Sequence, residues 1–110
     1  MKKEYRLKKN WEFNQVINTK QQFLNRFLIV YYKKSTSLKI GITVPKKFAN
    51  SVGRNFYKRQ LRAILHDLNL YDLNYEFVII ARKDFVVSDF KTKKDEINKL
   101  FEKFRKNGKI

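Results

Sequence analysis

Residues 52–66, VGRNFYKRQLRAILH, restrict the fold of this chain more than any other segment. As a helix, with about 100° between successive residues, this segment places five cationic or amide side chains within an arc of roughly 140°. These five, called the basic stripe below, are Arg54, Asn55, Lys58, Arg59 and Arg62. Leu61, Ile64 and Leu65 fall on a neighbouring arc that can face a core. The segment contains no acidic residue, which is typical of a helix that packs on one side and meets a polyanion on the other.

The composition of the whole chain agrees with a folded, polyanion-binding domain. The 110 residues include 26 Lys and Arg but only 10 Asp and Glu, so the formal charge is +16 at pH 7. Hydrophobic residues make up 43% of the chain, which is enough for a core, and we expect a single domain over residues 1–110. A charge of this size implies nucleic acid or an anionic membrane as the partner.

Targeting and redox signals are sparse. Residues 1–9 form a basic arm that lacks the apolar stretch of a signal peptide, and no apolar run has the length of a transmembrane helix. The chain contains no Cys, so neither a disulfide nor a thiolate metal site is expected. These features favour a cytoplasmic protein.

Hydrophobic periodicity predicts seven elements in the order α-β-β-β-α-β-α. The expected helices are residues 10–18 with Asn10 as N-cap, a helix from Asn50 or Ser51 to about Leu68, and a helix from Ser88 to about Lys106. The expected strands are residues 21–24, 26–34, 38–44 and 76–82. The second and third strands are close enough in sequence to form an antiparallel hairpin. The last helix has an apolar stripe of Phe90, Ile97, Leu100, Phe101 and Phe104. This order predicts a two-layer α+β sandwich with helices on a four-stranded, mainly antiparallel sheet.

The residues offer no convincing catalytic or metal site of their own. His66 is the only His and stands beside Asp67 near a helix end, where a surface position is expected. The other candidate carboxylates, Asp72, Asp84 and Asp89, are scattered near loops and helix ends, whereas a two-metal nuclease gathers its carboxylates around the ions. Neither a P-loop nor a Gly-rich nucleotide motif is present. We therefore expect no cleavage by the polypeptide alone.

Phe13 and Ile17, one turn apart on the first helix, and Tyr31 on the second strand form a second candidate constellation. Aromatic and apolar side chains of this kind contact the exposed base faces of single-stranded RNA. All three can equally belong to the hydrophobic core, and for Ile17 and Tyr31 the residues by themselves favour the core.

The basic stripe has the pattern R-N-x-x-K-R-x-x-R, which resembles the signature of the bacterial ribonuclease P protein subunit. Three other segments resemble that family in the same order: Arg6-Leu7-Lys8-Lys9 with Phe13 and Val16, Ile40-Gly41-Ile42-Thr43-Val44 with Lys46-Lys47, and Val78-Ile79-Ile80-Ala81-Arg82. Four positions depart from the usual family pattern: Ile17, Ser51, Phe56 and Tyr57. None of these departures removes a charge from the basic stripe.

The resemblance implies a fold and a task. The fold is similar to that of a ribosomal small-subunit protein and of a domain of a translocating elongation factor, with a left-handed β-α-β crossover through the basic helix, against the usual rule. The chain would be the protein subunit of ribonuclease P, the RNA-based endonuclease that removes the 5′ leader from precursor tRNA. The RNA would hold the catalytic centre and most of the Mg²⁺, with one protein for each catalytic RNA and no organic cofactor.

The resemblance also assigns residues. The basic stripe would bind the catalytic RNA. Five further residues match positions that line the leader-binding cleft of the family: Phe13, Ile17, Tyr31, Thr43 and Lys47. A structural RNA-binding protein of ribosomal type is the alternative, since composition does not separate the two. A DNA-binding module is less favoured because the basic helix has no partner helix close in sequence, and a membrane-surface role is weaker still.

Overall fold

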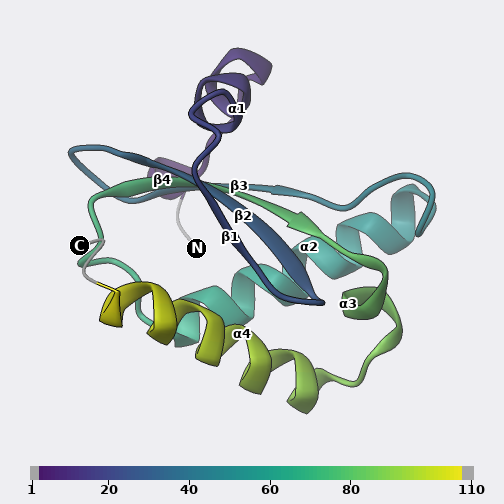
Figure 1. Cartoon of the computed structure of the whole chain (residues 1–110). Coiled ribbons are helices and arrows are strands. Elements are labelled where there is room, and N and C mark those ends of the chain that lie inside the picture. The colour runs from purple at the N-terminus through teal and green to yellow at the C-terminus, as the bar shows by residue number, and fades with distance from the viewer. Residues whose placement is uncertain (1–2, 108–110) are drawn as a thin grey trace.

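A mixed β-sheet with helices on both faces forms the framework of the molecule (Figure 1). The computed structural model describes residues 3–107. Its helices are η1 (Lys3–Tyr5), α1 (Asn10–Ile17), α2 (Ser51–Asp67), α3 (Lys83–Val87) and α4 (Phe90–Lys106). Its strands are β1 (Gln22–Leu24), β2 (Leu28–Lys34), β3 (Lys39–Thr43) and β4 (Tyr75–Ala81). The predicted α+β class and the order of the predicted elements are confirmed, and α2 and α4 form the layer below the sheet in Figure 1, while α1 lies above it.

The strands follow the order β1-β2-β4-β3 across the sheet. β1 pairs with β2 and β2 with β4 in antiparallel fashion, whereas β3 and β4 are parallel. The predicted hairpin of residues 26–34 with 38–44 is therefore wrong, because β4 lies between these two strands. Ile79 of β4, for example, stands between Val30 of β2 and Ile42 of β3. The sheet within residues 3–107 is mainly antiparallel by pairs but mixed as a whole.

Burial on both faces explains the central place of β4. Val78 and Ile79 point to opposite faces of the sheet, and both are fully buried. A strand of this kind belongs in the interior of a sheet. The backbone N–H of Ser35, just after β2, donates to the carbonyl of Asn74, just before β4, at 2.9 Å and so aligns these strands. β3 then lies on the other side of β4, and α2 is the crossover between two parallel strands; its left-handed sense stays a prediction.

The main core lies between the sheet and the layer of α2 and α4. Leu61, Ile64 and Leu65 of α2 are fully buried, as predicted for the apolar seam of the basic helix. The predicted apolar stripe of α4 is buried except for Phe90, which is 45% exposed. Phe90 is exposed because α4 begins at this residue, with Asp89 and not Ser88 as its N-cap. The unpredicted helix α3 precedes it and contributes the fully buried Phe85 to the core.

The first helix begins differently from the prediction. Its N-cap is Lys9 and not Asn10, because the carboxylate of Glu12 accepts hydrogen bonds from the backbone N–H groups of Lys8 at 3.1 Å and Lys9 at 2.9 Å. These bonds hold the pKa of Glu12 below its usual range. For α2 the expectation of Asn50 as N-cap is confirmed, since its side chain accepts from the N–H of Gly53 at 2.9 Å.

The described part of the basic arm is ordered against the sheet. Arg6 forms a parallel bridge with Ile40 of β3, and the N–H of Leu7 donates to the carbonyl of Ile40 at 3.0 Å. The Leu7 side chain is buried. These contacts fix the position of Lys8 and the start of α1 relative to β3.

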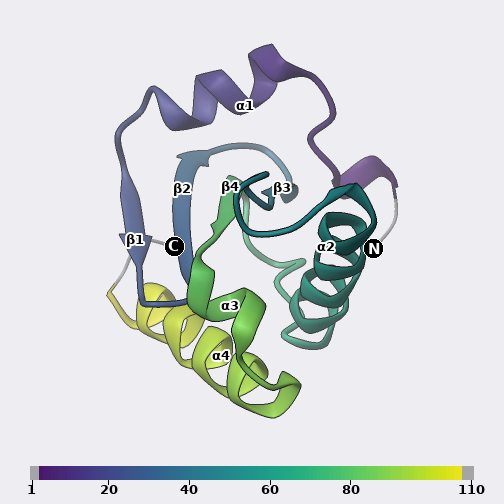
Figure 2. The same ribbon diagram turned by 90° about the vertical axis from the view of Figure 1, so that its right-hand side faces the viewer.

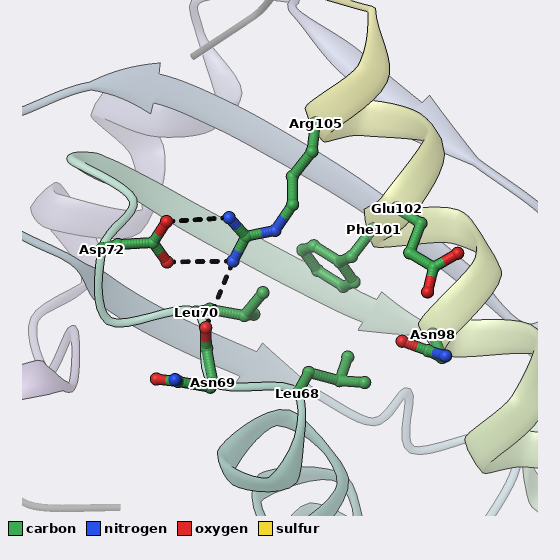
Figure 3. A pocket seen from close by; sticks show the side chains of 8 residues that line it. All are labelled: Leu68, Asn69, Leu70, Asp72, Asn98, Phe101, Glu102 and Arg105. Carbon is green, nitrogen blue, oxygen red and sulfur yellow. Dashed lines mark hydrogen bonds and ion pairs between the residues drawn. The ribbon is translucent and has the colours of Figure 1, made fainter.

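An ion pair fixes the connection between α2 and β4 (Figure 3). Two nitrogens of the Arg105 guanidinium, on α4, donate to the two carboxylate oxygens of Asp72 at 2.8 and 2.9 Å. The same guanidinium donates to the carbonyl of Asn69, whose φ of 54° is left-handed. Arg105 forms one side of a polar hollow of about 460 Å³ at the C-terminal end of α2, beyond the basic stripe.

Replacing Asp72 with Asn tests this ion pair. The hydrogen bonds from Arg105 lower the pKa of Asp72, so the pair stabilises the fold above the ordinary Asp value of 3.8 and loses this effect as the pH falls through the lower folded value. Because Asp72 is largely exposed, we expect Asp72→Asn to lower the free energy of unfolding by less than about 1 kcal/mol at pH 7. In urea denaturation the difference should shrink as the pH falls below 3.8; a difference independent of pH would contradict the assignment.

Candidate nucleic-acid interface

The upper face of the sheet carries α1 on a small cluster of its own. Leu7, Val16 and Val78 are buried there, and four partly buried side chains pack against them: Phe13, Ile17, Tyr31 and Ile80. Beyond the end of α1, the hydroxyl of Thr19 lies 2.7 Å from the carbonyl of Val16 and 3.0 Å from that of Tyr32 on β2. The helix is therefore held by apolar contacts along its length and by hydrogen bonds at its end.

Gly41 allows α1 to approach the sheet closely. A Cβ atom at this position would lie 2.5 Å from Cζ and 2.6 Å from Cε2 of the Phe13 ring, far inside van der Waals contact. Gly41 pairs with Val78, which in turn pairs with Tyr31, so the Phe13 ring lies over a row that crosses three strands. A glycine inside a strand often marks such a close approach, and this signal was available in the sequence.

A groove opens beside α1, between this helix, β3 and α2. It has a volume of about 510 Å³ and is lined by Lys8, Asn10, Phe13, Asn14, Ile17, Ile42, Thr43 and Lys58. Three of the residues assigned to the leader cleft, Phe13, Ile17 and Thr43, thus share one groove. This surface is called the α1–β3 groove below.

The other two residues assigned to the cleft lie apart from the groove lining. Tyr31 packs in the cluster beneath α1, half-buried beside Phe13 and Ile17. Lys47 lies in the loop between β3 and α2, where it is exposed and its ammonium stands 5.1 Å from the centre of the Phe48 ring. The geometry therefore brings Tyr31 to the same face of the sheet and leaves Lys47 on the connection to the basic helix.

Five residues of the groove lining were not assigned to a leader cleft from the sequence: Lys8, Asn10, Asn14, Ile42 and Lys58. A signal for two of them exists, because Asn10, Asn14 and Ile17 follow the i, i+4, i+7 spacing of one helix face, with Phe13 between them. The presence of Lys58 in the lining depends on the packing of α2 beside β3 and has no local signal.

The basic stripe consists of two rows on α2. Arg54, Lys58 and Arg62, four residues apart, are half-buried and form the inner row. Asn55 and Arg59 are exposed and form the outer row. Burial and, to a smaller extent, the charge of Arg6 lower the pKa of Arg62.

A buried cation supports α2 from behind. Lys93 of α4 is 2% exposed, and its ammonium donates to Oε1 of Gln60 at 2.7 Å. The same ammonium stands 5.0 Å from the ring centre of Tyr57 and 4.5 Å from that of Phe85. Burial lowers the pKa of Lys93, and the charge of Asp89 acts in the opposite direction. Because Tyr57 and Gln60 flank Lys58 and Arg59 in sequence, this contact helps fix the rotation of α2 about its axis.

Within residues 3–107 no group of three or more His, Cys, Asp or Glu side chains lies close enough together to hold a metal ion. His66 is exposed, and its Nδ1 lies 2.8 Å from the hydroxyl of Tyr71. Phe56, which departs from the family pattern, stays 50% exposed and touches the neighbouring Tyr57 ring. The same described residues include no helix with the length and apolar character to span a bilayer.

The family model described as Ribonuclease P matches residues 1–105 of the chain. The chain belongs to the ribonuclease P protein family. A ribonuclease P protein component from Mycoplasmopsis synoviae (strain 53) is 58% identical over 111 residues, covering 100% of this chain and 99% of the relative. Among solved structures, the RNase P protein of Staphylococcus aureus superposes with a TM-score of 0.81 at 26% identity, covering 89% of this chain and 93% of that one. The RNase P protein from Thermotoga maritima gives a TM-score of 0.74 at 26% identity, covering 86% and 94%.

These comparisons confirm the resemblance found in the sequence, and both solved structures named above are ribonuclease P proteins. The chain is accordingly a protein component of ribonuclease P, the enzyme of tRNA 5′ processing. The alternative of a structural RNA-binding protein of ribosomal type is not supported.

The contact of Phe13 with Gly41 can be tested with a double-mutant cycle. An alanine methyl group at position 41 collides with the Phe13 ring, so we expect Gly41→Ala to lower the free energy of unfolding by about 1 to 3 kcal/mol, as overpacking does. In a Phe13→Ala background the collision is absent, and the same change should be close to neutral. Urea denaturation of the four proteins measures both values; equal costs in the two backgrounds would show that the ring does not rest on Gly41.

Proposed function

We propose that this ribonuclease P protein binds the catalytic RNA of the enzyme through the basic stripe and the 5′ leader of precursor tRNA through the α1–β3 groove. In this way it assists endonucleolytic removal of the leader to give the mature 5′ end. The observation that carries the proposal is a groove that combines apolar side chains with polar and cationic ones, directly beside a cationic helix, in a chain of charge +16.

The groove suits a single strand of RNA. Phe13 and Ile17 offer an aromatic and an aliphatic surface for bases, and Thr43 offers a hydroxyl. The groove lies between α1, β3 and α2, and we propose that one extended strand occupies it. Sequence-specific and extended contacts of proteins with RNA are made mostly to single strands of this kind. Tyr31, beneath Phe13 and Ile17, keeps the floor of the groove in place.

The division of labour in the enzyme is part of the proposal. As the family resemblance implies, we assign Mg²⁺ and the catalytic centre to the RNA subunit. The basic residues of the protein neutralise phosphates where catalytic RNA and precursor meet, which lowers the concentration of divalent ions that this crowding requires. One protein per catalytic RNA, acting in the cytoplasm, completes the proposal.

Reconstitution tests this function directly. A bacterial ribonuclease P RNA and a precursor tRNA are incubated at low Mg²⁺ with and without the protein, and release of the 5′ leader is followed. We expect leader removal with both components and little with either alone. Unchanged cleavage on addition of a protein that binds the RNA would refute the role in leader removal, and cleavage by the protein alone would refute the assignment of the catalytic centre.

Charge removal from the basic stripe tests the site for catalytic RNA. Arg59→Ala and Arg62→Ala are each expected to weaken binding to the catalytic RNA by about 1 kcal/mol and to reduce the slope of log K against log salt by about one. The wild-type slope should be about −3.5 to −4.5 if about five phosphates are neutralised, four of them by the charged residues of the stripe. Because Arg59 is exposed, Arg59→Ala should change the free energy of unfolding by no more than about 0.5 kcal/mol. Filter binding over a range of salt concentrations gives the affinities and slopes, and circular dichroism is the control for folding. If both variants keep the wild-type affinity at moderate salt, the stripe does not contact the catalytic RNA.

A further inference from the structure

Lys58 belongs to two surfaces at once. By its place on α2 it is a member of the basic stripe, yet its side chain also lines the α1–β3 groove together with residues of α1 and β3. No other member of the stripe is among the described residues that line this groove. The stripe is therefore not a uniform surface facing one partner.

The two rows of α2 explain this difference. Successive residues of a helix are about 100° apart, so Lys58 and Arg59 point in different directions although they are neighbours in sequence. Lys58 is half-buried in the inner row, and Arg59 is exposed in the outer row. An RNA that covers the outer row and a strand that lies in the groove can thus occupy different sides of the same helix.

The charges at the groove are not balanced by the protein. Lys8 approaches the groove from the N-terminal arm and Lys58 from α2, and the described lining residues include no acid. Glu12, the acidic residue of α1, is engaged with the backbone N–H groups of Lys8 and Lys9. Neither Lys8 nor Lys58 is in any of the ion pairs formed within residues 3–107. Two ammonium groups from separate segments therefore meet a common space that favours an anion.

We propose that Lys58 binds a phosphate of the precursor leader in the α1–β3 groove, with Lys8 on a second phosphate, and not the catalytic RNA. This inference rests on the proposed function and divides its basic stripe by partner. The other residues of the stripe meet the catalytic RNA, and Lys58 tracks the backbone of a strand whose bases lie on Phe13 and Ile17. Phosphate contacts of this kind position a strand without selecting its sequence.

A matched pair of substitutions separates the two assignments. Lys58→Gln and Arg59→Gln each remove one positive charge from adjacent positions and leave a good helix-forming residue in its place. Two affinities are measured for each protein: that of the protein for the catalytic RNA, and that of the holoenzyme, assembled at saturating protein, for tRNA with and without a leader. Lys91→Gln, an exposed position on α4 away from both surfaces, controls for the loss of net charge.

Lys58→Gln should weaken binding of leader-bearing precursor about fivefold, the upper range for one exposed ion pair. Its binding of mature tRNA and of the catalytic RNA should match that of Lys91→Gln. Arg59→Gln should show the opposite pattern, with weaker assembly and unchanged preference for the precursor. Lys58→Arg should restore precursor affinity, and Lys8→Gln, at an exposed position, should reproduce the pattern of Lys58→Gln independently.

The outcomes distinguish this inference from the function on which it rests. If the wild-type holoenzyme binds precursor and mature tRNA with equal affinity, the protein does not bind the leader and the proposed function itself is refuted. A wild-type preference for precursor that Lys58→Gln and Lys8→Gln both retain, with loss of affinity for the catalytic RNA instead, would overturn the assignment of Lys58 and leave the proposed function intact.

Discussion

The two-sided burial of β4 is the constraint on which the rest of the structure depends. Its alternate residues point into two different clusters, with Phe77 and Ile79 facing α2 and α4 and Val78 facing α1. A sheet with such a central strand needs cover on both faces, because each exposed apolar side chain loses the stabilisation of burial. Helices of 17 residues cover one face, whereas α1, with eight, covers only part of the other. The uncovered remainder, between α1 and β3, is the groove.

Local patterns were sufficient to predict the three longer helices, α1, α2 and α4, but neither the short helix α3 nor the order of the strands. The apolar seam and the charged face of α2 follow from residues three and four apart, so the helix and its buried side were predictable. The expected hairpin of β2 and β3 rested on a short connection, while the real arrangement depends on the burial of Val78 and Ile79 far along the chain. Helix α3 has five residues, and its one fully buried residue, Phe85, gives no periodic signal.

The candidate site also contains residues that the sequence predicted and residues that only the packing of distant segments brings there. Phe13, Ile17 and Thr43 were assigned through the resemblance, and they do lie together. Lys58 was expected in the stripe alone, because the angle between helix residues says nothing of a strand from another part of the chain that packs beside them. The burial of Lys93 likewise could not be predicted from its own helix. A lysine on an amphipathic helix is normally solvated, and its burial here depends on Tyr57 and Gln60 from α2 and on Phe85 from α3.

The distribution of charge links folding to binding. The ion pairs within residues 3–107 all include a residue of α4, which lies on the opposite face of the sheet from α1 (Figures 1 and 2). None of these ion pairs includes a residue of the basic stripe or Lys8 of the groove, so the positive charges on these two surfaces are not offset by them. Repulsion among these cations destabilises the compact state in the absence of RNA. An anion that binds only the folded chain relieves that repulsion and stabilises the fold by mass action. The same charges that oppose folding of the isolated protein therefore supply its affinity for RNA.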